Sequence, residues 1–161
     1  MSSLNNLIVN IANRLDRHEF NVQEVQNILF LIDWRAALSE KPSISNLEWE
    51  IGNDGAYSKS FMEKLSSDTK QQDFIKQDKI KISQYDLNIH DKMNTWQDSI
   101  ILFTTSRIKK LNSNEFDNLI KSIFPMKLER YIPINLSKIA KEYLESGISI
   151  QTINFKDSSK G

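Results

Sequence analysis

The feature that most constrains the fold of this chain is a run of five apolar residues at positions 28–32, with the sequence ILFLI. Asn21 precedes the run, and Glu24 lies three residues after Asn21, which is the spacing of a helix N-terminal capping box. Pro42 disfavours a helical residue ahead of it, so a helix that starts near Asn21 must end before it. Because the run is apolar on every helical face, we expect this helix to be the central one, covered on all sides.

The rest of the chain is also dominated by helical patterns. Apolar residues recur at spacings of three and four, and Ser60, Ser113 and Asn135 are the expected caps of later helices. The chain has only four glycines and three prolines, which argues against a sandwich or barrel with many tight turns. The predicted fold is therefore mainly α, a compact helical domain around a buried central helix. The further helices are expected at 4–15, 60–65, 91–109, 113–123 and from 136 to a stop at Gly147.

Three segments depart from helical spacing. In residues 74–82, two short apolar runs flank a polar centre, which predicts a small β-hairpin or ribbon that packs on the helical body. In residues 43–57, Gly52 and Gly55 bracket two polar residues, which predicts a turn with a positive φ or a close backbone approach. Residues 148–161 form a tail that is an edge strand, a partner-ordered segment or disordered, so we place a single domain at 1–147.

Composition narrows the class of protein. A length of 161 residues fits one domain, and 21 basic residues balance 21 acidic ones, so no bulk attraction to nucleic acid or an anionic membrane is expected. The absence of cysteine excludes disulfides and thiolate metal sites. No apolar run is long enough to span a bilayer, and the first residues lack the basic region of a secretory signal. We therefore expect a cytoplasmic protein without a membrane partner or a cofactor.

The sequence contains few residues in arrangements that could support catalysis. His18 lies in an expected linker, and His90 adjoins Asp91 on an expected helix, where adjacent side chains do not face each other. Metal sites need three or four converging ligands, and the aspartates of the loops lack the spacing of a calcium-binding loop. No phosphate-binding glycine motif or nucleophile motif occurs. We expect no enzyme activity, no catalytic residue and no metal, and keep an enzyme with a site around Asp33, Asp54 and His90 as a third hypothesis.

Basic residues are enriched in the C-terminal third, beginning with Arg107, Lys109 and Lys110. Basic side chains are favourable near a helix C-terminus, which explains these three residues without DNA binding. Nearby acidic residues offset the positive charge of the other basic residues. Nucleic acid is therefore not the expected partner. A DNA-binding transcriptional autoregulator of its own operon stays open as the alternative function.

The aromatic residues give a more specific prediction. Trp34 and Trp49 each fit a core position, but tryptophan and tyrosine are also the residues that most often dominate protein interfaces. Trp49 lies in the irregular 43–57 segment, with Tyr57 soon after it, and functional residues favour loops on a rigid scaffold. We predict an exposed aromatic site at Trp49 and Tyr57, and a partner-binding set of Trp34, Trp49, Gly55 and Tyr57.

The stretches ILFLIDWR at 28–35, KPSISNLEW at 41–49 and GAYS at 55–58 resemble the SocA-like antitoxin domain, also called the Panacea domain. That family has a helix of the L-x-Y-L-x-D-W kind, then a P-I-(S/T)-x-x-x-W stretch and a Y-G-P-Y turn. Further stretches, NEF, IFPM and LSKIAKEY, extend the resemblance over roughly residues 4–146. One departure is plain, because the proline of the family's turn is replaced by Ala56 here.

The resemblance implies a bacterial or phage antitoxin. Such a protein neutralises a cognate toxin, usually encoded beside it, by direct binding, and some members deliver the toxin to a protease. Members also occur in phage defence, so a phage-defence component is a further alternative function. Because the domain is paired with many unrelated toxins, the resemblance implies a toxin partner, and protease machinery as a second one, without identifying the toxin.

Overall fold

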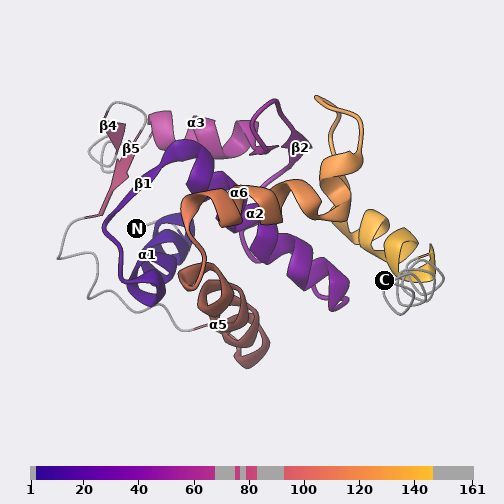
Figure 1. The fold of residues 1–161 in the computed structure, drawn as a ribbon, viewed down its shortest axis with the longest axis horizontal. Helices are drawn as coiled ribbons and strands as arrows, with labels where there is room; N and C mark the ends of the chain where they lie inside the picture. Colours follow the sequence, from indigo (N-terminus) through magenta and orange to yellow (C-terminus); the bar gives the residue numbers. More distant parts are fainter. Residues whose placement is uncertain (1–2, 68–74, 77–78, 83–92, 147–161) are drawn as a thin grey trace.

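The computed structural model of the chain describes residues 3–67, 75–76, 79–82 and 93–146 (Figure 1). As the sequence predicts, it is mainly helical. The predictions for residues 83–92 and for the tail at 148–161 lie outside the described residues, as does the stop at Gly147. In chain order the elements are α1 (Ser3–Leu15), β1 (Glu19–Asn21), α2 (Val22–Leu38), β2 (Glu50–Ile51), β3 (Ala56–Tyr57), α3 (Lys59–Ser67), β4 (Ile75–Lys76), β5 (Lys79–Lys81), α5 (Thr95–Lys109), α6 (Ser113–Ser122), the 3-10 helix η2 (Phe124–Lys127) and a last helix at 136–146.

The helix α2 is the buried centre of the fold, which confirms the prediction from the apolar run. Ile28, Leu29 and Phe30 are almost fully buried. The Asn21 side chain caps the helix by accepting a hydrogen bond from the Glu24 backbone N–H at 2.7 Å. The Glu24 carboxylate instead accepts two hydrogen bonds from the Arg17 guanidinium, at 2.8 and 2.9 Å, and so joins the start of α2 to the chain that enters β1.

Helix α5 packs against both α1 and α2 (Figure 1). The apolar stripe predicted for α1 is buried, and it consists of Leu4, Leu7, Ile8, Ile11, Ala12 and Leu15. Val9 and Asn5 are also buried, so the covered face is wider than expected. For α5, helical spacing predicts a covered face formed by Met93, Trp96, Ile100, Phe103 and Ile108. This prediction is partly wrong, because Phe103 is exposed while Ile101 and Thr105 are buried. The Thr105 hydroxyl donates to the Ile101 carbonyl at 2.7 Å, which allows this polar residue to face the core.

A small antiparallel sheet with the order β1-β5-β4 lies at one end of the helical body (Figure 1). The predicted hairpin is confirmed by the pairing of β4 with β5, while β1 is an unpredicted third strand. In β1 only Phe20 is buried, and it lies opposite Ile80, which is also buried. These two side chains join the main core, so the sheet covers α1 and α2 rather than standing alone.

Two of the predicted helix caps are shifted along the chain. Helix α3 begins at Lys59, and the Ser58 hydroxyl accepts from the Phe61 N–H at 3.1 Å, so Ser58 and not Ser60 is in the capping position. Helix α6 is capped by Asn112 rather than Ser113. The last predicted cap is confirmed, because the Asn135 side chain accepts from Lys138 N–H at 3.1 Å. An adjacent polar residue can supply the same hydrogen bond, which is why caps shift more easily than helices.

The carboxylate of Asp33 on α2 holds the irregular segment that follows the helix. One oxygen, Oδ1, accepts from the backbone N–H groups of Ile44 at 2.9 Å and Ser45 at 3.0 Å. The other, Oδ2, accepts from the hydroxyls of Ser43 at 3.0 Å and Ser45, and from Trp49 Nε1 at 2.9 Å. Asp33 is almost fully buried, so these five donors replace its hydration.

The C-terminal segment closes over this region. The Ile134 N–H donates to the Trp49 carbonyl at 2.8 Å, and the Tyr131 N–H donates to the Ile51 carbonyl at 2.9 Å. A second, smaller apolar cluster then forms between the end of α2 and the helix at 136–146, from Trp34, Ala37 and Ala140. The last helix is therefore held by packing on α2.

We expect Asp33→Asn to lower the free energy of unfolding by about 3 kcal/mol, because an amide nitrogen would face donors that cannot all turn into acceptors. The Trp49 indole can only donate. Urea unfolding followed by circular dichroism measures the loss. The matched control is Asp117→Asn on the exposed face of α6, for which we expect a change below about 0.5 kcal/mol. Equal effects of the two substitutions would contradict the structural role of Asp33.

Candidate functional site

The predicted exposed aromatic site is not exposed at Trp49. Its side chain is only 3% exposed, donates to Asp33 through Nε1, and packs edge-on against Phe30 with ring centroids 5.2 Å apart. Trp34 is also buried, with its ring 5.7 Å from that of Tyr143. The expectation of exposure is wrong at Trp49 because a buried carboxylate accepts the polar end of the indole, so the whole ring can enter the core.

The glycine turn predicted in the 43–57 segment is confirmed at Gly55. Strands β2 and β3 form a hairpin around it, and Gly55 has a φ of +133°. A Cβ at this position would lie 2.4 Å from Asn27 Oδ1 on α2, so glycine is required both for conformation and for space. The turn is closed by a 2.7 Å hydrogen bond from the Gly52 N–H to the Gly55 carbonyl.

Side-chain amides of α2 hold the hairpin in place. Asn27 Oδ1 accepts from the Ala56 N–H at 3.0 Å, and Gln23 Nε2 donates to the Ala56 carbonyl at 2.8 Å. Gln26 Oε1 accepts from the Ser58 N–H at 2.9 Å. A proline in place of Ala56 would have no N–H to donate to Asn27, so this hydrogen bond would be lost.

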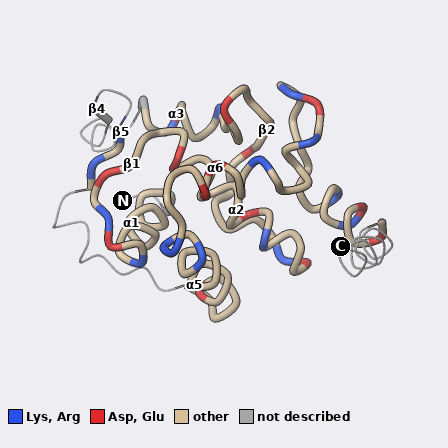
Figure 2. The backbone as a smooth tube through the Cα atoms, in the orientation of Figure 1, with Lys and Arg blue, Asp and Glu red and all other residues tan. Residues whose placement is uncertain are grey.

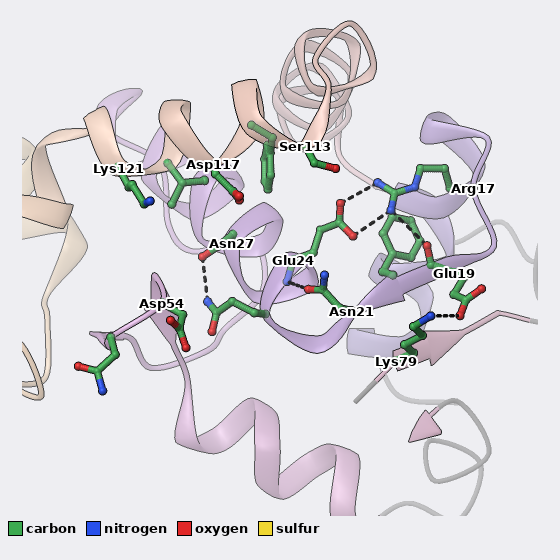
Figure 3. A pocket seen from close by; sticks show the side chains of 15 residues that line it. Arg17, Glu19, Asn21, Glu24, Asn27, Asp54, Lys79, Ser113, Asp117 and Lys121 are labelled. Atoms are coloured by element: carbon green, nitrogen blue, oxygen red, sulfur yellow. Dashed lines mark hydrogen bonds and ion pairs between the residues drawn. The ribbon is translucent and has the colours of Figure 1, made fainter. Parts of the chain in front are cut away.

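An open cavity of about 620 Å³ lies beside this hairpin turn (Figure 3). The start of α2, the sheet strands β1 and β5, the hairpin turn and α6 enclose it. In Figure 3, Asp117 and Lys121 extend from α6 across the opening from Asp54 of the turn. Its lining residues are Arg17, Glu19, Phe20, Asn21, Gln23, Glu24, Asn27, Asn53, Asp54, Lys79, Ser113, Phe116, Asp117, Ile120 and Lys121.

The charges of the cavity fall into two groups. On the side of β1 they are paired, with Glu24 bound by Arg17 and with Lys79 Nζ 3.4 Å from Glu19 Oε1. On the side of the turn and α6, Asp54, Asp117 and Lys121 form no ion pair within the described part of the chain. The arrangement is thus suited to bind polar and charged groups at its opening, above an apolar floor that includes Phe116.

Two exposed large hydrophobic side chains follow each other in the loop before Pro133. Tyr131 is 58% exposed and Ile132 is 45% exposed. Tyr131 has a φ of +64°, which is unusual for a residue other than glycine, and its hydroxyl donates to Asn53 Oδ1. The same oxygen accepts from Arg130 Nη1 at 3.3 Å. Because Asn53 also lines the cavity, Tyr131 lies at the cavity rim.

The remaining predicted residues occupy different places. Gly55 and Tyr57 lie in the hairpin, where Tyr57 is half-buried, and His18 is exposed in a loop as expected. Asp33 and Asp54 line different cavities, while His90 is outside the described residues. Tyr131 and Ile132 were missed, although a tyrosine and an isoleucine that directly follow the charged Glu129 and Arg130 and precede Pro133 are a detectable signal.

Comparisons with family models, with curated proteins and with solved structures find no match for this chain. Among the described residues, no three or more His, Cys, Asp or Glu side chains are grouped as a metal site would require. Over the same residues, no helix has both the length and the apolar character needed to cross a membrane.

We expect Gly55→Ala to destabilise the protein by about 2–3 kcal/mol, because the added Cβ meets Asn27 at a positive φ. Gly52→Ala is the matched control in the same turn. Its Cβ would contact Tyr57 Cβ at 3.3 Å and the Gly55 carbonyl at 3.4 Å, so we expect a loss of less than about 1 kcal/mol. Urea unfolding compares the two variants, and a larger loss at Gly52 would contradict the role assigned to Asn27.

Proposed function

We propose that this protein is an antitoxin-like protein-binding module, which neutralises a cognate toxin by direct binding. The proposed contact surface, called here the rim surface, consists of Tyr131, Ile132 and the hairpin turn at 52–55, with the adjoining cavity opening. The observation that carries the proposal is the exposure of Tyr131 and Ile132, 58% and 45%, on a loop that hydrogen bonds hold against β2.

Exposed large apolar side chains favour a partner when they are held in place before binding. Backbone bonds from Tyr131 to Ile51 and from Ile134 to Trp49 fix both ends of the short exposed segment. A positive φ at a tyrosine is unfavourable by about 1–3 kcal/mol, so the surrounding structure must hold this conformation. Such a preformed segment loses little conformational entropy on association, which favours tight binding.

The cavity supplies the polar part of the same surface. Protein interfaces combine a buried apolar centre with a polar rim, and tyrosine is enriched at their centres. Here Tyr131 and Ile132 provide apolar area, while Asp54, Asp117 and Lys121 offer charges without an ion-pair partner among the described residues. A partner with exposed apolar side chains flanked by charges of both signs would complement this arrangement.

Residues in the stretches that resemble the family hold the rim surface in position. Asp33 and Trp49 fix the segment that leads into β2, and Trp34 packs on the helix at 136–146. Gly55 and Tyr57 belong to the hairpin itself. In this proposal Trp34 and Trp49 position the surface, whereas Gly55 and Tyr57 lie at its edge. The expected toxin is a protein encoded by an adjacent gene. Delivery of the toxin to a protease is a second expected outcome of binding.

We expect the double variant Tyr131→Ala, Ile132→Ala to bind the toxin at least about tenfold more weakly, because truncating two exposed interface residues removes about 1–2 kcal/mol or more. The experiment is co-expression of the full chain with the product of each adjacent gene, with growth rescue and copurification as measurements. Leu102→Ala is the control, since Leu102 is an equally exposed apolar residue on α5.

The possible outcomes test the proposed function and the proposed surface separately. Rescue by the wild type and by Leu102→Ala, but not by the double variant, supports both the function and the surface. Rescue that the double variant retains in full excludes the rim surface. No rescue and no copurifying neighbour for the wild type contradicts the antitoxin function itself.

A further inference from the structure

A second surface, away from the cavity, combines an exposed ring with two arginines. Phe103 on α5 is 41% exposed, and the guanidinium carbon of Arg35 lies 4.3 Å from its ring centroid. The guanidinium carbon of Arg107 lies 4.7 Å from the same centroid. Arg35 comes from α2 and Arg107 from the last turn of α5, so two helices bring like charges to one aromatic ring.

This arrangement is electrostatically incomplete by itself. Burial lowers the pKa of the Arg35 guanidinium from its ordinary value, and the positive charge of Arg107 lowers it further. Both effects disfavour the charged form that Arg35 nevertheless keeps near neutral pH. Neither arginine forms an ion pair with an acidic residue in the described part of the chain. A carboxylate supplied from outside would relieve the repulsion and bind to guanidinium groups already held in place by the ring.

A second cation and ring lie further along the same helices. Lys41, just beyond α2, lies 5.6 Å from the ring centroid of Trp96 near the start of α5. Trp96 and Phe103 are seven residues apart, which puts them on one face of α5 at a separation of about 10 Å along the axis. Side chains of an extended peptide alternate between its two faces, so acidic residues that both reach this surface lie at positions i and i+2 or i and i+4. Their separations are about 7 and 13 Å, on either side of the spacing between the two rings.

The neighbouring apolar residue decides what kind of anion fits. Leu102 is 54% exposed beside Phe103, so the surface offers apolar area as well as positive charge. Across the described backbone, acidic and basic residues are otherwise interspersed (Figure 2), and the whole chain has no net charge. A nucleic acid backbone gains most from a broad positive field, which is missing here. An acidic protein segment that also carries an apolar residue satisfies both parts of the surface.

We propose that Arg35, Phe103 and Arg107, with Leu102 beside them, form a binding site for an extended acidic segment of another protein. The segment has carboxylates two or four residues apart, on one face, the first bound between the two arginines and the second at Lys41. An apolar side chain of the same segment packs on Leu102. This site shares no residue with the rim surface and does not depend on the antitoxin proposal.

The test uses the full-length protein and a fluorescein-labelled ten-residue peptide with glutamate at every second position except one, which is leucine, so that these side chains share one face of the extended chain. The control probe has glutamine in place of every glutamate. Fluorescence anisotropy is expected to show binding of the acidic peptide at about 0.05 M salt, with weaker binding at about 0.5 M because salt screens exposed charges. The glutamine peptide is expected to bind at least about tenfold more weakly.

The decisive variant is Arg107→Gln, because Arg107 is exposed and its loss should leave the fold intact. We expect it to weaken acidic-peptide binding about fivefold or more, and Phe103→Ala to do the same. Lys121→Gln on α6 is the matched control, since it removes one exposed cation elsewhere. Circular dichroism confirms that the variants are folded, and Tyr131→Ala should leave peptide binding unchanged.

Three results would overturn the inference. The first is no binding of the acidic peptide to the folded wild type. The second is equal binding of the glutamine peptide, or an equal loss in Lys121→Gln, which would make the attraction non-specific. The third is a single-stranded oligonucleotide of the same length that binds more tightly and loses affinity in Arg107→Gln, because the surface would then recognise phosphates.

Discussion

The carboxylate of Asp33 is the interaction on which the rest of the structure depends. A single buried charge accepts hydrogen bonds from two backbone N–H groups, two serine hydroxyls and the Trp49 indole. These bonds convert a segment without regular structure into a fixed one, from which β2 starts. The backbone of Trp49 then pairs with Ile134, so the order imposed by Asp33 extends to the C-terminal segment. Without the carboxylate, buried donors would lack acceptors at the centre of the fold.

Helix α2 therefore has two roles that its sequence displays together. Its apolar residues fill the core, while Gln23, Gln26 and Asn27 hold the hairpin and Asp33 holds the preceding segment. Gln26, Asn27 and Asp33 are buried together with the apolar residues, and hydrogen bonds to the backbone of the following segment satisfy their polar groups. A helix of this kind determines the positions of loops as well as the packing of its neighbours.

The sequence predicts the parts of this fold that local chemistry determines. The central helix, the amphipathic α1, the hairpin at 74–82 and the special conformation of Gly55 follow from apolar spacing and from glycine placement. Pairings between distant segments are not predictable in this way. Strand β1 has only three residues and exists through its pairing with β5. The burial of Trp49 depends on a carboxylate sixteen residues away, and the outward position of Phe103 depends on how α5 packs against α1 and α2.

Helix α2 is continuous from Val22 to Leu38, and it carries residues of both surfaces. Asn27 lines the cavity, and Arg35 stacks on Phe103, about 12 Å further along the helix axis. Neither a hinge nor a glycine lies between them. Helix α2 therefore offers no flexible element through which occupation of one surface could change the shape of the other. The coupling free energy between the two surfaces should be close to zero, so that two ligands would bind additively rather than cooperatively.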